Sequence, residues 1–484
     1  MKLSKPTFVA IYPSLPNQQT LAPVDEVQLV WRQLLEHAVD EYDGTSFVAD
    51  AAQQTGWNGI VFQPQTTDLG VVVDEILLHN PTLIGISALS FHVPSVYILA
   101  EAIKNRKSDV KIIVGGYHAT FMPEDFTTLE SVDFVYRGAE LESFKRFLRD
   151  YEKECKTRTS GNPANKIVNP LWTRADRLDL DTVSSQRPSD RKILLSEYQA
   201  QDFGIWPKGG FAYLKESSGC PMQCSFCEVP RYLGSEVKIR SIHLVLDEIQ
   251  SLYQKGIRTI FFEGENFYGK WAIDLVKALE KLEIDMHFGA EIMAAALTPE
   301  YIVQLAAGKF VKVAIGIESP VGSDRAYLNK PGAVKVDFDQ AFRTLREHGI
   351  LGFGFRMTGL PSYTNNELWR NEMLVRHAPY DELRLTIFTP MPGTQLGDTW
   401  DHTTMPVSSD WGLFDSTRLV YKHPHLSESD IWRSQWREHY LFITSENFRQ
   451  NRDIMLSKRP ELEEGFKKYE AGVMKRLEFL ETRI

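Results

Sequence analysis

The stretch Cys220-Pro-Met-Gln-Cys224-Ser-Phe-Cys227 places three cysteines within eight residues. Iron–sulfur clusters are held by cysteine thiolates, and a cubane cluster usually takes four ligands. A tight loop that offers only three thiolates leaves one iron with an open position for a small molecule. The spacing therefore predicts a cluster that is held by Cys220, Cys224 and Cys227 and that binds a further ligand.

A structural zinc site is the alternative for three clustered cysteines. Zinc takes four ligands, commonly from two Cys-x2-4-Cys pairs or from added histidines. Neither His243 nor Cys155 lies at a spacing that completes such a set. The pattern thus favours a cluster over zinc.

The length and composition indicate a globular protein of several domains. A chain of 484 residues is too long for one ordinary core, so two or three domains are expected. The net charge of −10 argues against a nucleic-acid partner. No apolar stretch approaches the roughly 20 residues that span a bilayer. Three of the four cysteines are clustered, so we expect no disulfide framework and a reducing, cytoplasmic environment.

Residues 1–150 alternate short apolar runs with amphipathic stretches, which is typical of a Rossmann-like parallel α/β sheet. The run Thr7–Tyr12 breaks at Pro13 and lacks a cleavage site, so it is read as a strand and not as a signal peptide. Such sheets bind ligands at the carboxyl ends of their strands, where small residues let the backbone approach a large ligand. Candidate ligand-binding residues at these ends are Pro13, Ser14, Ser87, Ala88, Ser90, Gly115, Gly116, Tyr117, His118, Arg137, Gly138 and Glu140.

Residues 206–395 repeat the alternation of strand and helix six times. The predicted strands are Phe211–Lys215, Thr259–Glu263, Met286–Ala290, Lys312–Ile317, Gly352–Met357 and Leu383–Phe388. Six units make a partial barrel, since a complete one takes eight. A linker over 151–205 and a mainly helical domain over 396–484 complete the predicted organisation.

The Cys-x3-Cys-x2-Cys spacing resembles the radical SAM superfamily, whose open iron binds the amino and carboxylate groups of S-adenosylmethionine (SAM). The resemblance implies a [4Fe-4S] cluster and release of a 5′-deoxyadenosyl radical. It places Phe226 against the adenine and the segment Glu263-Gly264-Glu265 at the SAM amino group, without deciding which of these three residues holds it. It assigns Glu318 to the SAM ribose or ammonium. Arg356 is a candidate for the SAM carboxylate, with an ion pair to Glu318 or Glu265 as the alternative.

The first 150 residues look like the cobalamin-binding domain that precedes the barrel in one radical SAM subfamily. The segments IGIS (84–87), KIIVGGYHAT (111–120) and YRGAE (136–140) carry this resemblance. The Asp-x-His-x-x-Gly loop of other cobalamin domains is absent after Tyr12, so cobalamin is expected base-off and without a histidine ligand. His118 is a candidate cofactor contact, or else a loop imidazole that caps the next helix. The alternative for the whole block is a scaffold that binds no cobalamin.

The two resemblances together imply a cobalamin-dependent radical SAM enzyme, most simply a C-methyltransferase. In methylating members, the radical abstracts hydrogen from an unactivated carbon, which then takes methyl from methylcobalamin. A small or lipid-like metabolite is expected as substrate, and a flavodoxin- or ferredoxin-type protein as electron donor. The alternatives are a non-methylating member, such as a cyclase, a rearrangement enzyme or an oxidising enzyme, and a domain that only senses cobalamin.

Overall fold

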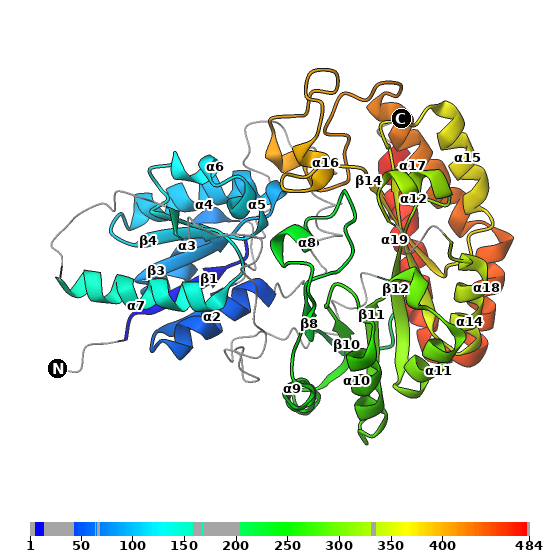
Figure 1. The fold of residues 1–484 in the computed structure, drawn as a ribbon, viewed down its shortest axis with the longest axis horizontal. Coiled ribbons are helices and arrows are strands. Elements are labelled where there is room, and N and C mark those ends of the chain that lie inside the picture. The colour runs from blue at the N-terminus through cyan, green and yellow to red at the C-terminus, as the bar shows by residue number, and fades with distance from the viewer. Residues whose placement is uncertain are drawn as a thin grey trace.

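The computed structural model describes residues 5–13, 43–62, 64, 68–157, 167–168, 204–330 and 335–481. Ser14, one of the candidate ligand-binding residues, lies outside these ranges. Two parallel sheets with packed helices lie side by side, and C-terminal helices cover the second sheet (Figure 1).

Six parallel strands form the first sheet, in the order β2-β1-β3-β4-β5-β6. They are β1 (Thr7–Ile11), β2 (Asn58–Phe62), β3 (Leu83–Ser87), β4 (Lys111–Gly115), β5 (Phe134–Tyr136) and β6 (Ile167–Val168). The accompanying helices are α2 (Asp43–Gln54), α3 (Leu69–Leu78), η1 (Ser90–His92), α4 (Val93–Arg106), α5 (Tyr117–Phe121), α6 (Glu124–Thr127) and α7 (Leu141–Thr157).

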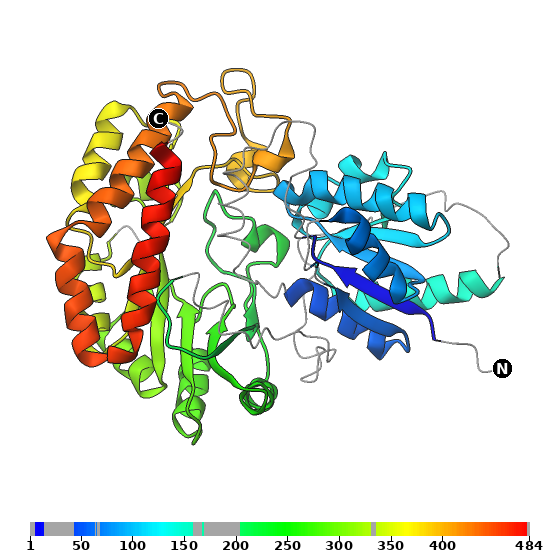
Figure 2. The ribbon, with the colours of Figure 1, turned by 180° about the vertical axis from the view of Figure 1, so that it is seen from behind.

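Side chains of this first sheet alternate between two cores, as the pleat of a strand requires. Val9 and Ile11 pack in the core that includes α3 and α4, whereas Phe8 and Ala10 pack in the core that includes α2 and α7. Helices therefore cover both faces (Figure 2), and the Rossmann-like prediction is confirmed.

Six further parallel strands form the second sheet, in the order β14-β13-β12-β11-β10-β7. They are β7 (Gly210–Leu214), β10 (Ile257–Phe262), β11 (His287–Glu291), β12 (Phe310–Glu318), β13 (Leu351–Thr358) and β14 (Glu382–Ile387). The helices of this region are α8 (Val229–Tyr232), α9 (Ile242–Gln254), α10 (Lys270–Glu280), α11 (Pro299–Ala307), α12 (Gly322–Tyr327), α14 (Phe338–Glu347), α15 (Asn365–Val375) and α16 (Gln395–Asp398). Each strand follows its sequence neighbour in the sheet, so the predicted partial barrel is confirmed.

Aromatic side chains fill the inner face of the partial barrel. Phe261 packs there with Phe211, Tyr213, Phe353 and Phe355. The outer face belongs to a larger core that joins the barrel to its helices. The two faces alternate along each strand, which fixes the direction in which each strand-end side chain points.

Helices of the C-terminal segment close the open edge of this sheet. They are α17 (Glu428–Ile443), α18 (Glu446–Lys458) and α19 (Glu463–Glu481). The Tyr469 hydroxyl accepts the N–H of Leu383 at 2.9 Å and donates to the carbonyl of the same residue at 3.3 Å. One side chain of α19 thus satisfies backbone groups that the edge strand β14 would leave unpaired. Across the described ranges, no helix combines the length and apolar character needed to cross a membrane.

The C-terminal segment also reaches back to the first domain. Trp411 packs against the core beside α3 and α4, with its ring centroid 4.7 Å from that of His118. At a second contact, the α-carbon of Gly393 lies so close to Phe121 that an added Cβ would fall 2.3 Å from the ring. Both contacts fix the first sheet relative to the barrel.

Candidate functional site

The three cysteines lie on a loop between β7 and α8, at the carboxyl ends of the barrel strands. The N–H of Cys220 donates to the carbonyl of Gly234 at 3.0 Å, which ties the start of the loop to its end. Gly219 precedes the first cysteine with a φ of 94°, and a Cβ there would meet the carbonyl oxygen of Glu236 at 2.4 Å. The tight approach of the two loop segments therefore requires glycine at this position.

The thiols of Cys220, Cys224 and Cys227 are partly buried and influence one another electrostatically. Burial raises the pKa of all three thiols, to about 12 for Cys227, and neighbouring thiols raise the pKa of Cys220 and Cys227 further. Thiolates gathered in this way need a compensating cation. Three thiolates on one loop match the ligand set of a cluster that keeps one iron open.

No three His, Cys, Asp or Glu side chains in the described ranges converge on a point that suits a single metal ion.

Glu265 links the second barrel strand to the cysteine loop. One of its carboxylate oxygens accepts from Lys215 Nζ at 2.5 Å, and the other accepts the N–H of Gly219 at 2.9 Å. Lys215 also donates to the carbonyl oxygen of Glu263 at 2.9 Å. A carboxylate offers about four lone-pair sites, so Glu265 can still accept from the ammonium of a ligand.

Gly264 is held by a buried carboxylate that follows the first barrel strand. Its N–H donates to Glu216 Oε2 at 3.0 Å, and the Ser217 hydroxyl donates to Oε1 of the same carboxylate at 3.0 Å. A Cβ on Gly264 would lie 2.0 Å from Glu216 Oε1. Burial raises the pKa of Glu216 to about 7. Glu216 therefore holds the turn 263–265 through the N–H of Gly264, and Lys215 holds it through Glu263 and Glu265.

Glu318 ends the fourth barrel strand in the left-handed backbone region, with a φ of 60°. Its carboxylate forms an ion pair with Lys330, whose ammonium lies 5.9 Å from the ring centre of Phe226. Cys224 and Cys227 both influence the Lys330 ammonium electrostatically. The structure therefore brings Glu318 close to Phe226 and the cysteine loop, and SAM contacts of these two residues stay a prediction.

Arg356 points away from this region, contrary to the prediction. It follows Phe355 on β13 and so takes the opposite, outer face of the strand. Its guanidinium lies 2.7 Å from Glu438 of α17, and both side chains are buried. The expected alternative partners, Glu318 and Glu265, pair with lysines instead. Arg356 therefore joins the barrel to α17 and does not face a ligand.

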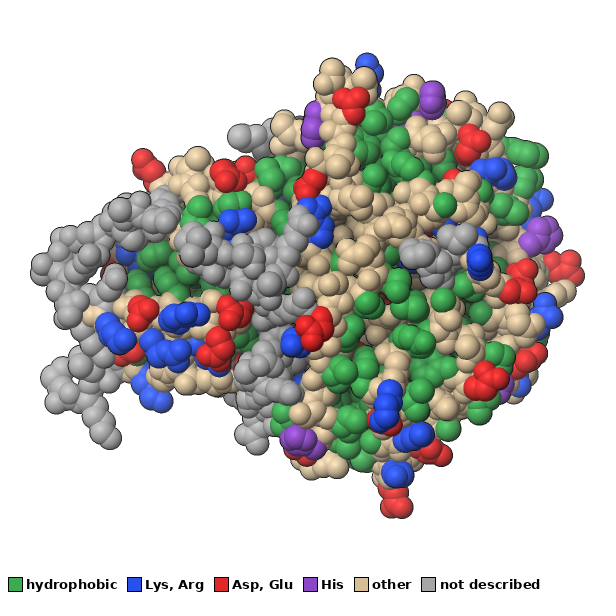
Figure 3. Space-filling view, in the orientation of Figure 1, with side chains coloured by type: hydrophobic (Ala, Val, Ile, Leu, Met, Phe, Trp, Pro, Cys, Tyr) green, Lys and Arg blue, Asp and Glu red, His purple; other side chains and the backbone are tan. Residues whose placement is uncertain are grey.

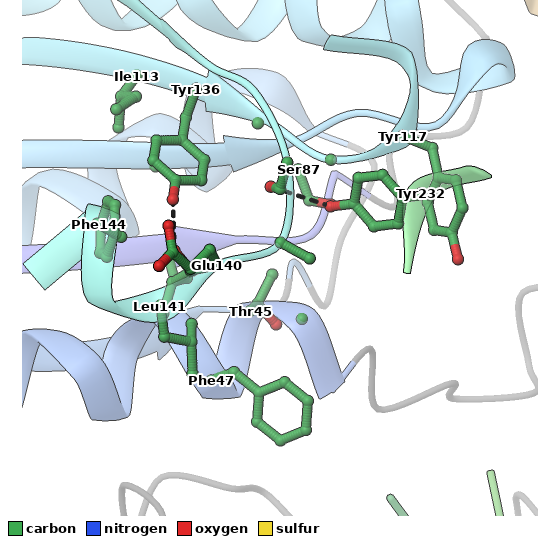
Figure 4. A pocket seen from close by; sticks show the side chains of 18 of the residues that line it. Thr45, Phe47, Ser87, Ile113, Tyr117, Tyr136, Glu140, Leu141, Phe144 and Tyr232 are labelled. Carbon is green, nitrogen blue, oxygen red and sulfur yellow. Dashed lines mark hydrogen bonds between the residues drawn. The ribbon is translucent and has the colours of Figure 1, made fainter. Parts of the chain in front are cut away.

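A cavity of about 240 Å³ opens at the carboxyl ends of the strands of the first sheet (Figure 4). Apolar and aromatic side chains from β1, β5, α2 and α7 line its depth, among them Phe8, Phe47, Tyr136 and Phe144. Residues of the second domain line its mouth; they are Lys215, Tyr232, Leu233 and Glu263. The cavity thus lies between the first sheet and the strand ends of the barrel that bear Lys215 and Glu263.

Half of the candidate residues in the first domain lie on this cavity. Those that line it are Ser87, Gly115, Gly116, Tyr117, Gly138 and Glu140, whereas Pro13, Ala88, Ser90, His118 and Arg137 do not. Ser87 Oγ is buried without a hydrogen-bond partner in the described part of the chain, as expected for a hydroxyl that meets a ligand. Gly116 has a φ of 102°, and a Cβ there would lie 2.9 Å from the carbonyl oxygen of Ala88. These residues fit a large, partly apolar ligand that approaches the backbone closely.

His118 and Arg137 hold the loops beside the cavity. The ring nitrogens of His118 lie 3.0 Å from Ser90 Oγ and 2.9 Å from Asp125 Oδ2, and the ring is buried. Arg137 Nε donates to the carbonyl oxygen of Thr120 at 3.0 Å. A cobalamin contact of either side chain stays a prediction.

Four site residues escaped the sequence analysis. Lys215 and Glu216 directly follow the first barrel strand, so the rule that ligands meet strand carboxyl ends could have found them. Lys330 lies on an irregular segment and Tyr232 ends the four-residue helix α8, and neither stretch has a pattern that marks the direction of a side chain.

Comparison with known families agrees with this geometry. The family model of the B12 binding domain matches residues 44–148, and that of the radical SAM superfamily matches residues 216–372. The first match covers strands β2 to β5 of the sheet that bears the cavity, and the second covers the cysteine loop and the barrel strands β10 to β13.

Two curated proteins and one solved structure are also similar to this chain. An uncharacterized methyltransferase of Pyrococcus horikoshii is 25% identical over 364 residues, which are 73% of this chain and 76% of that protein. The hopanoid C-2 methylase of Rhodopseudomonas palustris is 23% identical over 49% of this chain and 43% of its own length. The radical S-adenosylmethionine methyltransferase TsrM of Kitasatospora setae, solved with cobalamin and a [4Fe-4S] cluster, has the same fold. It superposes with a TM-score of 0.65 at 16% identity and covers 94% of this chain and 99% of that one.

Proposed function

Because the chain belongs to the radical SAM enzymes that carry a B12-binding domain, we propose that it is a cobalamin-dependent C-methyltransferase. The observation that carries the proposal is the cavity of the first sheet, whose mouth is built by Lys215, Tyr232 and Glu263 of the barrel. A cobalamin in this cavity would face the same strand ends that bear the cysteine loop. Methyltransferases of Pyrococcus horikoshii and Rhodopseudomonas palustris among the relatives support methyl transfer.

The cluster, SAM and cobalamin supply reductive SAM cleavage and methyl transfer when bound, and the protein supplies their placement. Cys220, Cys224 and Cys227 would hold the iron. Glu265, fixed by Lys215, would accept hydrogen bonds from the SAM ammonium, which is a charge-assisted interaction. Glu318, at the end of β12, would accept from the ribose.

The inner face of the barrel is suited to shielding a reactive species from water. Phe261, Phe353 and Phe355 pack with Tyr213 and Trp206 below the polar strand ends. Water exclusion by such a layer limits side reactions. We infer a small or lipid-like metabolite as substrate, bound above this layer.

We also infer an external electron donor of the flavodoxin or ferredoxin type and a cytoplasmic location. The clustered, partly buried thiols support a reducing environment. Nucleic acid is not expected as a substrate, since the net charge is −10. On the face shown in Figure 3, Lys and Arg side chains are interspersed with Asp and Glu and gather in no basic stripe.

Anaerobic reconstitution with iron, sulfide and hydroxocobalamin tests this function. With SAM and a reductant, the protein is expected to release S-adenosylhomocysteine in a cobalamin-dependent manner, together with 5′-deoxyadenosine. Cys224→Ala is expected to abolish 5′-deoxyadenosine release. Release of 5′-deoxyadenosine alone, with or without cobalamin, would instead indicate a non-methylating radical SAM enzyme.

A further inference from the structure

Tyr232 links the cysteine loop to the first domain, and we propose that it is the residue that positions cobalamin relative to the cluster. This inference rests on the proposed function, because it requires cobalamin in the cavity. It adds a residue of the barrel domain to a site that the sequence placed wholly in the first domain.

The backbone of Tyr232 belongs to the same hydrogen-bonded segment as the three cysteines. Helix α8 begins two residues after Cys227, and the N–H of Tyr232 donates to the carbonyl of Glu228 at 2.9 Å. Two residues further on, Gly234 accepts the N–H of Cys220 at 3.0 Å. This hydrogen bond closes the segment 220–234 into a loop, and Tyr232 lies two residues before the end of that loop.

The side chain of Tyr232 reaches two strand ends of the first sheet. Its hydroxyl donates to the carbonyl oxygen of Gly138, after β5, at 3.3 Å. Its ring lies 4.0 Å from the ring of Tyr117, after β4, at an interplanar angle of 31°. Figure 4 shows the two tyrosines together at the edge of the cavity. All three residues line the cavity, and only 8% of Tyr232 is exposed.

Through these contacts, the Tyr232 side chain lines the cavity while its backbone belongs to the cysteine loop. The ring of Tyr232 is buried between the domains and, together with the contacts of Trp411 and Gly393, holds them at a fixed separation. Any shift of the cysteine loop relative to the cavity would break the hydrogen bond or the ring contact. Tyr232 therefore sets the distance between a cobalamin in the cavity and the cluster on the loop.

Two substitutions separate the roles of the hydroxyl and the ring. Tyr232→Phe removes the hydrogen bond and keeps the ring, whereas Tyr232→Leu removes both. Tyr97→Phe is the matched control, because the Tyr97 hydroxyl donates to the Asp125 carbonyl at 3.0 Å in the first domain but does not line the cavity. The full-length, cluster-loaded proteins are titrated with hydroxocobalamin by absorbance, and iron content and S-adenosylhomocysteine release are measured in parallel.

We expect cobalamin affinity to fall about fivefold in Tyr232→Phe, as for one lost hydrogen bond, and more than about tenfold in Tyr232→Leu. At saturating cobalamin, Tyr232→Leu is expected to release S-adenosylhomocysteine about tenfold more slowly, because the reacting groups are misplaced. Iron content and the Tyr97→Phe affinity are expected to stay unchanged.

The outcomes separate this inference from the function on which it rests. Wild-type protein that binds no cobalamin would refute the proposed function. Wild-type binding that Tyr232→Leu retains at full affinity and rate would overturn the role of Tyr232 alone. Should Tyr232→Leu fail to fold, an unchanged affinity in Tyr232→Phe would overturn it equally.

Discussion

The ammonium of Lys215 lies 2.5 Å from Oε1 of Glu265, and this ion pair joins the first barrel strand to the second at the cysteine loop. Burial opposes the charged form of Lys215, but Glu265 and Glu263 together raise its pKa above the ordinary value. The lysine therefore stays protonated, and it holds the carboxylate that we propose as the partner of the SAM ammonium.

Lys215→Met is expected to lower the free energy of unfolding by about 3 kcal/mol, since it leaves a buried carboxylate without its partner. Urea unfolding of the reconstituted protein measures this change. Lys270→Met is the control, because Lys270 pairs with Asp274 on the surface and such pairs contribute little. Equal stabilities of the two variants would contradict a structural role for the Lys215–Glu265 pair.

Gly116→Ala is expected to weaken cobalamin binding at least about tenfold, because a Cβ would displace the carbonyl of Ala88, next to the cavity-lining Ser87. Gly56→Ala provides the comparison. Gly56 has a similar φ of 93°, but nothing lies within 4 Å of an added Cβ. Both variants place a side chain at a positive φ, and only Gly116 also has a close backbone neighbour, so cobalamin affinity is compared between them. Equal affinities would show that Gly116 is not part of the site.

The stability of the turn 263–265 is expected to depend on pH through Glu216. Burial raises the pKa of this carboxyl from 4.5 to about 7, so the folded protein holds the proton more tightly than the unfolded chain. Stability is therefore lost as the pH rises from about 4.5 to 7, by at most about 3 kcal/mol. Glu216→Gln keeps an acceptor for Gly264 but cannot ionise. The free energy of unfolding should fall more between pH 5.5 and 8 in the wild type than in Glu216→Gln. Equal falls in the two proteins would exclude this titration.

Arg356→Met is expected to destabilise the protein by about 3 kcal/mol, because it leaves Glu438 buried and unpaired. The double variant Arg356→Met with Glu438→Leu should recover most of this loss. SAM affinity, measured by equilibrium dialysis, should be unchanged in the double variant. A large loss of SAM affinity there would restore Arg356 to the SAM site.

The order of strands and the cysteine loop could be predicted because both depend on local patterns. The apolar run Gly352–Met357 places β13 within a residue of its observed bounds. The direction of Arg356 could not be predicted, because a shift of one residue in strand register exchanges the inner and outer faces. The turn 263–265 lies at the cysteine loop and its contact with SAM stays a prediction, whereas its supports Lys215 and Glu216 depend on contacts about 48 residues apart in sequence.

The cavity residues divide for a similar reason. Ser87 ends β3 and Gly116 directly follows β4, so their placement follows from the topology of a parallel sheet. The positions of the His118 and Tyr232 side chains depend instead on how loops and domains pack. The ring of His118 is enclosed by Ser90, Asp125 and Trp411, and the last of these comes from a segment almost 300 residues away in sequence.

Metal and cobalamin content of the anaerobically reconstituted protein tests the central claim most directly. The account predicts ~4 iron ions per chain, held by the three cysteines, and an equimolar amount of cobalamin. Cys224→Ala should lose the iron and keep the cobalamin. Gly116→Ala should keep the iron and lose the cobalamin. A single bound zinc ion, or a wild-type protein that takes up iron but no cobalamin, would contradict the account.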